Sequence, residues 1–218
     1  MKDTDTIKKN IIKWNEIRNK NSGLKLLDSG NVIGLSRFSF EQMQIQESEY
    51  IHLYIGAEQD ETIYTPIFYM VGDEYDKIEL IQLHMDKVSS LHFKSPPYFN
   101  TTPNSSSISH ENIDVNVATI RSFKWFLYKS DWFTKVKSGE NVVRAFKIPL
   151  TSITNIFNDE SVQNILLFFG ITQFESGFNI DIIFCNSTSK SFERPTMYEN
   201  LTMPCPPYNC EDFALMNI

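Results

Sequence analysis

The cysteines at positions 205 and 210 belong to the sequence Pro-Cys-Pro-Pro-Tyr-Asn-Cys, which spans residues 204–210. Thiolates bind zinc and exchange disulfides, so Cys205 and Cys210 are the first candidates for chemistry. A zinc site needs four ligands and usually offers Cys-x2-Cys or Cys-x4-Cys pairs. Here the two cysteines are five residues apart, and no histidine lies near either of them. We therefore predict no metal ion, and a structural segment whose cysteines form a candidate disulfide or redox pair.

Two of the four histidines have neighbours that suit a binding or catalytic role. In a strand, His52 would share a face with Tyr50 and Tyr54. In a strand, His84 would likewise share a face with Asp86, as a general base and the carboxylate that orients it would. A lone histidine among aromatic residues is more often a packed or half-exposed residue than a general base, and no nucleophile is evident to complete the set of His84 and Asp86. We predict no catalytic residue and keep His52, His84 and Asp86 as candidate ligand-binding residues.

Acidic residues cluster at 58–61 and 73–76, between segments that resemble strands. Without the loop pattern of a calcium-binding hand, they are predicted to be solvated charges in turns. The chain has no Walker A loop, no Gly-x-Gly-x-x-Gly, no Gly-x-Ser-x-Gly and no His-Glu-x-x-His. We expect no cofactor, and the sequence favours a protein that is not an enzyme.

Composition limits the classes of partner. With 41% hydrophobic and 13% aromatic residues, the chain of 218 residues is predicted to fold. Its net charge of −7 argues against nucleic acid and anionic membranes as partners, since both attract basic surfaces. An unidentified protein or small molecule is the expected partner. The absence of an apolar signal core, and the presence of only three cysteines, favour the cytoplasm.

Four sequence blocks recur in the same order, which predicts a tandem duplication. The second copy follows the first by about 110 residues at both ends and by 114 in the middle. The pairs are Trp14 with Trp125, residues 30–40 with 140–150, residues 53–57 with 167–171, and residues 95–98 with 205–208. Each copy is predicted to be a helix-strand-helix-strand-strand unit. We expect an α+β fold with two repeats, at residues 1–105 and 106–218, related by a pseudo-twofold axis and docked through their long aromatic helices.

Apolar spacing predicts the main elements. Ile7, Ile11 and Trp14 form the buried stripe of a first helix, widened by Ile12 and Ile17. A second helix, at residues 114–137, is predicted to be covered on two sides because it has two apolar stripes. These are Val117, Ile120, Phe123 and Leu127, and Trp125, Tyr128 and Trp132.

The strands are predicted to differ in exposure. Residues 164–169 are almost continuously apolar, which is typical of a strand buried on both faces, with Phe168 and Phe169 fully covered. Residues 178–184 alternate, so Asp181 should face water. Pro66 cannot donate a ladder hydrogen bond and predicts a sheet edge or a bulge. Residues 100–107 are predicted to be a loop, and Ser109 to cap the following helix.

The second copy resembles a group of small uncharacterised Bacteroidetes proteins that end in a Pro-Cys-Pro-Pro-x-Cys-like tail. Residues 146–150, 166–171 and 204–210 carry this resemblance, which covers about 100 residues. The present tail has one additional residue before Cys210. The group has no known activity, so the resemblance implies no function.

These observations favour a non-enzymatic binding or protein-interaction protein, because a duplicated, aromatic-rich chain can present a cleft or paired surface. One alternative is an enzyme whose site is assembled between the two repeats. Another is a structural assembly subunit.

Overall fold

A computed structural model describes residues 4–28, 32–45, 47–94, 115–139, 141–174, 177–187, 198–199, 202–206, 211 and 213–216. The described residues do not include the predicted loop at 100–107, Ser109, the first Pro-Pro-Tyr sequence at 96–98, or residues 207 and 208 of the second. None of the described helices is sufficiently long and apolar to cross a membrane.

Both halves of the chain contain helices and strands, so the fold is a mixed α+β fold. The elements up to residue 94 are α1 (Thr4–Ile17), α2 (Asn21–Leu27), β1 (Val32–Ser36), α3 (Arg37–Gln42), β2 (Tyr50–Asp60), β3 (Ile63–Gly72), η1 (Met85–Lys87) and β4 (Ser89–Lys94). Those that follow are α4 (Val115–Lys137), β5 (Ala145–Pro149), α5 (Leu150–Phe157), β6 (Asn164–Phe174), β7 (Gly177–Ser187), β8 (Tyr198–Glu199), β9 (Met203–Cys205) and η2 (Ala214–Met216).

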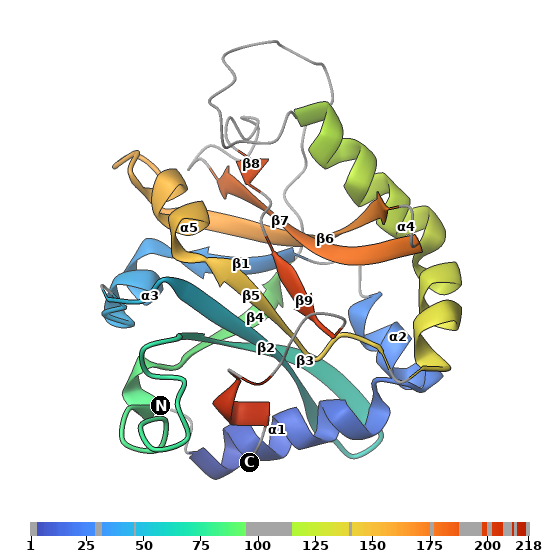
Figure 1. Cartoon of the computed structure of the whole chain (residues 1–218), viewed down its shortest axis with the longest axis horizontal. Coiled ribbons are helices and arrows are strands. Elements are labelled where there is room, and N and C mark those ends of the chain that lie inside the picture. The colour runs from blue at the N-terminus through green and yellow to red at the C-terminus, as the bar shows by residue number, and fades with distance from the viewer. Residues whose placement is uncertain are drawn as a thin grey trace.

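The strands form one antiparallel sheet in the order β8-β7-β6-β1-β4-β3-β2-β5-β9. The sheet curls strongly, so that β9 at one end contacts β7 near the other (Figure 1). Its concave side holds the main core, with Leu53, Phe68, Phe146 and Phe169 among the buried side chains. Helix α1 packs on β2, and α4 packs on β6 and β7.

Strand pairing joins the two halves of the chain. β1 pairs with β6, and β5 pairs with β2. The expectation that the halves dock through their long helices is therefore wrong. Backbone hydrogen bonds between strands of different halves make one continuous sheet, which a helix-to-helix contact could not do.

The two long hairpins have corresponding registers. Asp60 pairs with Ile63 in the first hairpin, and Phe174 pairs with Gly177 in the second, 114 residues later. Each hairpin has a glycine where a helix crosses it. A Cβ atom on Gly56 would lie 3.3 Å from Asn10 Cβ of α1, and one on Gly170 would lie 3.2 Å from Arg121 Cβ of α4.

Strand β4 changes partner along its length, which explains the position of Pro66. Residues Ser89 to His92 pair with β3, whereas Phe93 and Lys94 pair with β1. Pro66 pairs with Ala57 of β2 and lies just beyond the end of the β3–β4 ladder. Strand β3 lies inside the sheet, between β4 and β2, so it is not the predicted edge strand; only the end of β3 that carries Pro66 lacks a partner in β4.

The helix stripes are only partly as predicted. In α1, Ile7, Ile11, Trp14 and Ile17 are buried, and the Trp14 indole N–H donates to the Val143 carbonyl at 3.0 Å. Ile12 is exposed instead.

In α4, Trp125 and Trp132 are buried, and the Trp125 ring lies 5.3 Å from that of Phe169. The stripe containing Ile120, Phe123 and Leu127 is exposed, so coverage on two sides is wrong. Only the side with the two tryptophans meets the sheet.

Candidate functional site

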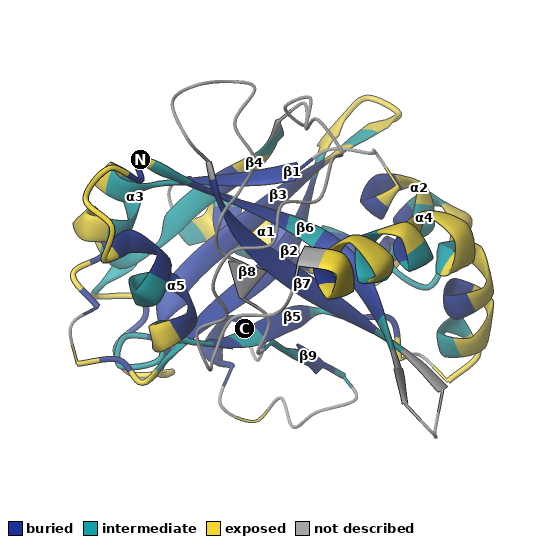
Figure 2. Ribbon diagram, turned by 90° about the horizontal axis from the view of Figure 1, so that it is seen from above, coloured by how far each residue is buried: buried dark blue, intermediate teal, exposed yellow. Residues whose placement is uncertain are grey.

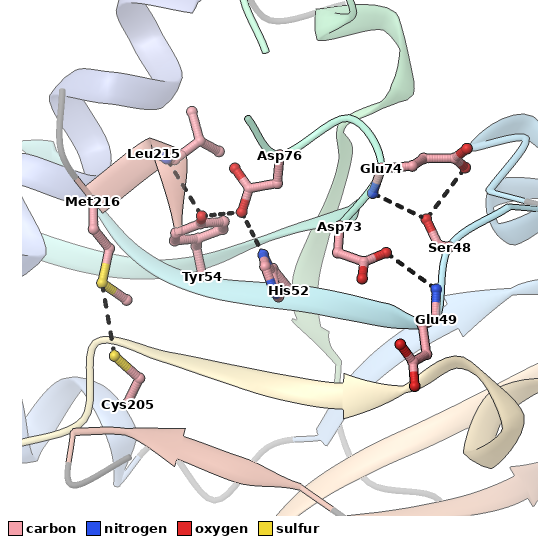
Figure 3. A network of polar contacts seen from close by, with 10 residues as sticks. All are labelled: Ser48, Glu49, His52, Tyr54, Asp73, Glu74, Asp76, Cys205, Leu215 and Met216. Carbon is pink, nitrogen blue, oxygen red and sulfur yellow. Dashed lines mark hydrogen bonds and ion pairs between the residues drawn. The ribbon is translucent and has the colours of Figure 1, made fainter. Parts of the chain in front are cut away.

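A buried polar cluster lies on the outer face of β2, where it joins residues from separate parts of the chain (Figure 3). The side chains of His52 and Tyr54 both point to this face, whereas the side chain of Leu53 between them points into the main core. His52 Nδ1 lies 2.5 Å from Asp76 Oδ2, and the Tyr54 hydroxyl donates to the same oxygen. One carboxylate oxygen therefore holds two side chains of β2.

The turn after β3 positions Asp76. The Asp76 N–H donates to the Gly72 carbonyl at 3.0 Å, which folds the chain back toward the sheet. Ser48 Oγ contacts Glu74 Oε1 at 3.2 Å, and the Glu49 N–H donates to Asp73 Oδ1 at 3.2 Å. These contacts hold the turn to the segment that precedes β2.

Every member of the cluster is shielded from solvent. His52 and Tyr54 are 0% exposed and Asp76 is 2% exposed. Burial, and then the neighbouring Asp76 carboxylate, raise the pKa of Tyr54 well above its ordinary value, so the hydroxyl stays protonated and donates. Among the described residues, His52 Nε2 and Asp76 Oδ1 have no hydrogen-bond partner.

Residues 213–216 close the cluster from outside. The Phe213 ring stacks on His52 with centroids 4.1 Å apart, and the Leu215 N–H donates to the Tyr54 hydroxyl at 3.3 Å. Arg144 Nη2 donates to the Met216 carbonyl at 3.2 Å. Burial lowers the pKa of Arg144 from its ordinary value. Both halves of the chain thus contribute to the cluster.

An imidazole oriented by a carboxylate is the base half of many hydrolytic sites, with Nε2 as the reactive nitrogen. In this structure Phe213 covers the imidazole, and His52 has no exposed surface. The cluster as it stands links residues 213–216 to the sheet.

Of the predicted site residues, only His52 belongs to this cluster. His84 precedes η1 rather than lying in a strand, and its ring is 5.0 Å from that of Tyr75. Asp86 is exposed, with one oxygen 3.5 Å from Lys87 Nζ. A helical turn does not put residues i and i+2 on one face, so the predicted His84–Asp86 pair is wrong.

Asp76 was predicted to be a solvated turn charge, and this is wrong. Asp73 and Glu74 of the same stretch are partly exposed, whereas Asp76 turns inward. No local sequence signal separates the three acidic residues. Their difference comes from the hydrogen bond to Gly72 and from the buried donors of His52 and Tyr54.

Cys205 is disulfide-bonded, while Cys210 lies outside the described residues. Cys205 Sγ lies 4.0 Å from Met216 Sδ, a sulfur–sulfur packing contact because a bonded sulfur has no proton to donate. Cys185 is free and buried, and burial raises its pKa to about 12. In the described part of the chain, no group of three or more His, Cys, Asp or Glu side chains is arranged to hold a metal ion.

A second buried carboxylate, that of Asp181, connects β7 to its neighbours. Asp181 Oδ2 accepts from Thr172 Oγ1 at 2.9 Å and lies 3.3 Å from Arg121 Nη1 of α4. Asp181 Oδ1 accepts from the Ile182 N–H at 2.9 Å and from Thr202 Oγ1 at 2.5 Å. Asp181 was expected to face water, and the structure corrects this: α4 and residue 202 cover that face of β7.

We expect the Asp181→Asn variant to respond differently to pH from the wild-type protein. Burial raises the pKa of Asp181 above its ordinary value of 3.8, although its hydrogen-bond donors and Arg121 oppose the shift. The folded protein thus holds this proton more tightly than the unfolded chain. The stabilisation that comes from this bound proton is complete below the pKa of Asp181 in the unfolded chain, and it is lost as the pH rises through the pKa of Asp181 in the folded protein.

Urea unfolding of both proteins, at pH values from about 3 to about 7, tests this expectation. The wild-type protein should lose stability relative to Asp181→Asn as the pH rises from 3.8 toward the raised pKa. A difference that stays constant, or that changes in the opposite direction, would contradict it.

The outer side of α4 is exposed (Figure 2), and this helix carries more exposed large hydrophobic side chains than any other described element. Eleven large hydrophobic side chains are exposed in the described residues, and six of them lie on this helix. The six are Val117 at 38%, Ile120 at 54%, Phe123 at 59%, Phe126 at 67%, Leu127 at 49% and Tyr128 at 39%.

No protein-family model matches the chain, and no curated protein or solved structure matches it.

Proposed function

We propose that the protein is a non-enzymatic interaction protein that binds a partner through the outer side of α4. One observation carries the proposal, which is the concentration of exposed apolar side chains on this helix. Single exposed hydrophobic residues are ordinary on a protein surface, but clustered ones mark binding surfaces. The six side chains together expose roughly 600 Å², at about 200 Å² for a fully exposed large side chain.

Photo-crosslinking in cells of the organism that encodes the chain tests this function. Benzoylphenylalanine at Phe123 should give a discrete adduct with one partner. The matched control position is Phe38 of α3, which is 71% exposed but stands alone on its helix as an exposed large hydrophobic residue. The same adducts from both positions, or none from Phe123, would contradict an interaction through α4.

The second candidate function is an enzyme whose site is assembled between the two halves. The cluster of His52 and Asp76 favours it, because Phe213, Leu215 and Arg144 of the second half complete the surroundings. The complete burial of His52 makes this the weaker candidate. A structural assembly subunit is the third, and it would use the same surface of α4 to bind further copies of the chain.

We also propose that the chain arose by tandem duplication of one unit. Apart from the additional helix α2 in the first half, the order helix, strand, short helix, strand, strand occurs in both halves, and the two hairpins correspond with an offset of 114 residues. Pairing of β1 with β6 and of β5 with β2 is the reciprocal exchange that a pseudo-twofold axis would produce. The boundary proposed for the repeats, residues 105 and 106, lies outside the described residues.

The expected partner is a protein, and the net charge of −7 still argues against nucleic acid. The cytoplasmic location stays a prediction. The disulfide bond of Cys205 weighs against it, since such bonds are typical of oxidising compartments.

A further inference from the structure

We infer that the outer side of α4 binds an acidic amphipathic helix of a partner protein. This inference rests on the proposed function and specifies the chemistry of the partner. It follows from the shape of the exposed apolar stripe and from the charges on the same helix.

The stripe has the geometry of a helix–helix contact. Ile120, Phe123 and Leu127 follow one another at spacings of three and four, so their side chains lie on one face of α4. That face is opposite the buried side formed by Trp125 and Trp132. It is about 10 Å long and one helix wide, which suits the apolar side of a second helix of two to three turns.

Charge distinguishes α4 from the rest of the chain. Five of the 20 basic residues but only one of the 27 acidic residues lie in α4, so 15 basic and 26 acidic residues remain elsewhere. Arg121 contacts Asp181, and Lys129 contacts Asp28 at 2.5 Å. Lys124 lies beside the stripe, between Ile120 and Leu127 on the helix surface. A basic helix in an otherwise acidic protein is complementary to carboxylates on its partner.

The same charges argue against the two other occupants of such a surface. Two copies of α4 packed on each other would bring like charges together, which costs free energy. An anionic membrane would also meet the acidic remainder of the chain. All six exposed apolar side chains of α4 together expose roughly 600 Å², and the stripe is only part of this area. Both areas are below the roughly 800 Å² per partner of a stable complex, so we expect a weak complex with micromolar affinity.

Two synthetic peptides of 21 residues serve as probes for the full chain. Both have leucine at the a and d positions of three heptads; one has glutamate and the other lysine at e and g. Fluorescence anisotropy should show micromolar binding of the glutamate peptide and at least tenfold weaker binding of the lysine peptide. Binding of the glutamate peptide should weaken in about 0.5 M salt.

Three variants locate the surface, and circular dichroism checks that each is folded. Phe123→Ser and Lys124→Glu should each weaken binding of the glutamate peptide at least fivefold, whereas Phe38→Ser should leave it unchanged. Equal or tighter binding of the lysine peptide would overturn the inference. So would unchanged binding to Phe123→Ser, or binding only to vesicles of anionic phospholipid.

The outcomes for the two proposals are distinguishable. A discrete adduct from Phe123 together with no binding of the glutamate peptide would leave the proposed function in place and overturn the partner chemistry. Sedimentation measures the oligomeric state of the free protein. Dimers that Phe123→Ser abolishes would mean that the surface binds a second copy of the chain and would overturn the acidic partner. Peptide binding without any cellular adduct would support the chemistry of the surface and contradict the proposed function.

Discussion

Replacement of Asp76 by Ala is expected to destabilise the protein by about 3–5 kcal/mol. The change removes the acceptor of two buried donors, His52 Nδ1 and the Tyr54 hydroxyl, in a region from which water is excluded. Buried polar groups that lose their partner keep the cost of desolvation without the compensating hydrogen bond. Urea unfolding at neutral pH, followed by tryptophan fluorescence, measures the loss.

A triple variant separates the cost of unpaired groups from the cost of lost packing. At the positions of the second hairpin that correspond to His52 and Tyr54, the chain has Leu166 and Phe168. We expect the variant with His52→Leu, Tyr54→Phe and Asp76→Ala to be more stable than Asp76→Ala alone, because it removes the donors as well as the acceptor. A triple variant less stable than the single one would show that the cluster itself stabilises the fold.

Replacement of Phe169 by Ala is expected to cost about 3–5 kcal/mol, because the side chain fills the main core. Phe169 is 5% exposed, and its ring lies near those of Trp125, Phe146 and Phe68. The surrounding strands pair on both sides of β6, so the cavity cannot close easily. The free energy of unfolding in urea measures this effect.

Phe168 is the matched control on the same strand. It was predicted to be fully covered, but it is only half-buried and packs against a small cluster on the outer face. We expect Phe168→Ala to cost about half as much or less, because part of the ring already contacts water. Equal losses for the two variants would mean that the outer face of β6 is as well covered as the core.

Local sequence patterns were sufficient to predict the buried sides of several helices and strands. The spacing of Ile7, Ile11 and Trp14 predicted the buried side of α1, since a helix that packs on one side needs apolar residues at that period. The apolar run at residues 164–169 predicted a strand buried on both faces, and β6 is buried there except at Asn164 and Phe168, which are partly exposed. Each of these features depends on residues that are neighbours in the sequence.

Contacts between segments that are distant in the sequence decided which acidic residue is buried and which side of α4 meets the sheet. Asp76 belongs to the same acidic stretch as Asp73 and Glu74, and its hydrogen bond to Gly72 together with the donors of His52 and Tyr54 selects it for burial. The two stripes of α4 are both apolar, and the position of Phe169 determines that Trp125 packs inward while Phe123 faces water. Periodicity gives the apolar sides of an element but not which of them meets the sheet, because that choice depends on how distant strands pair.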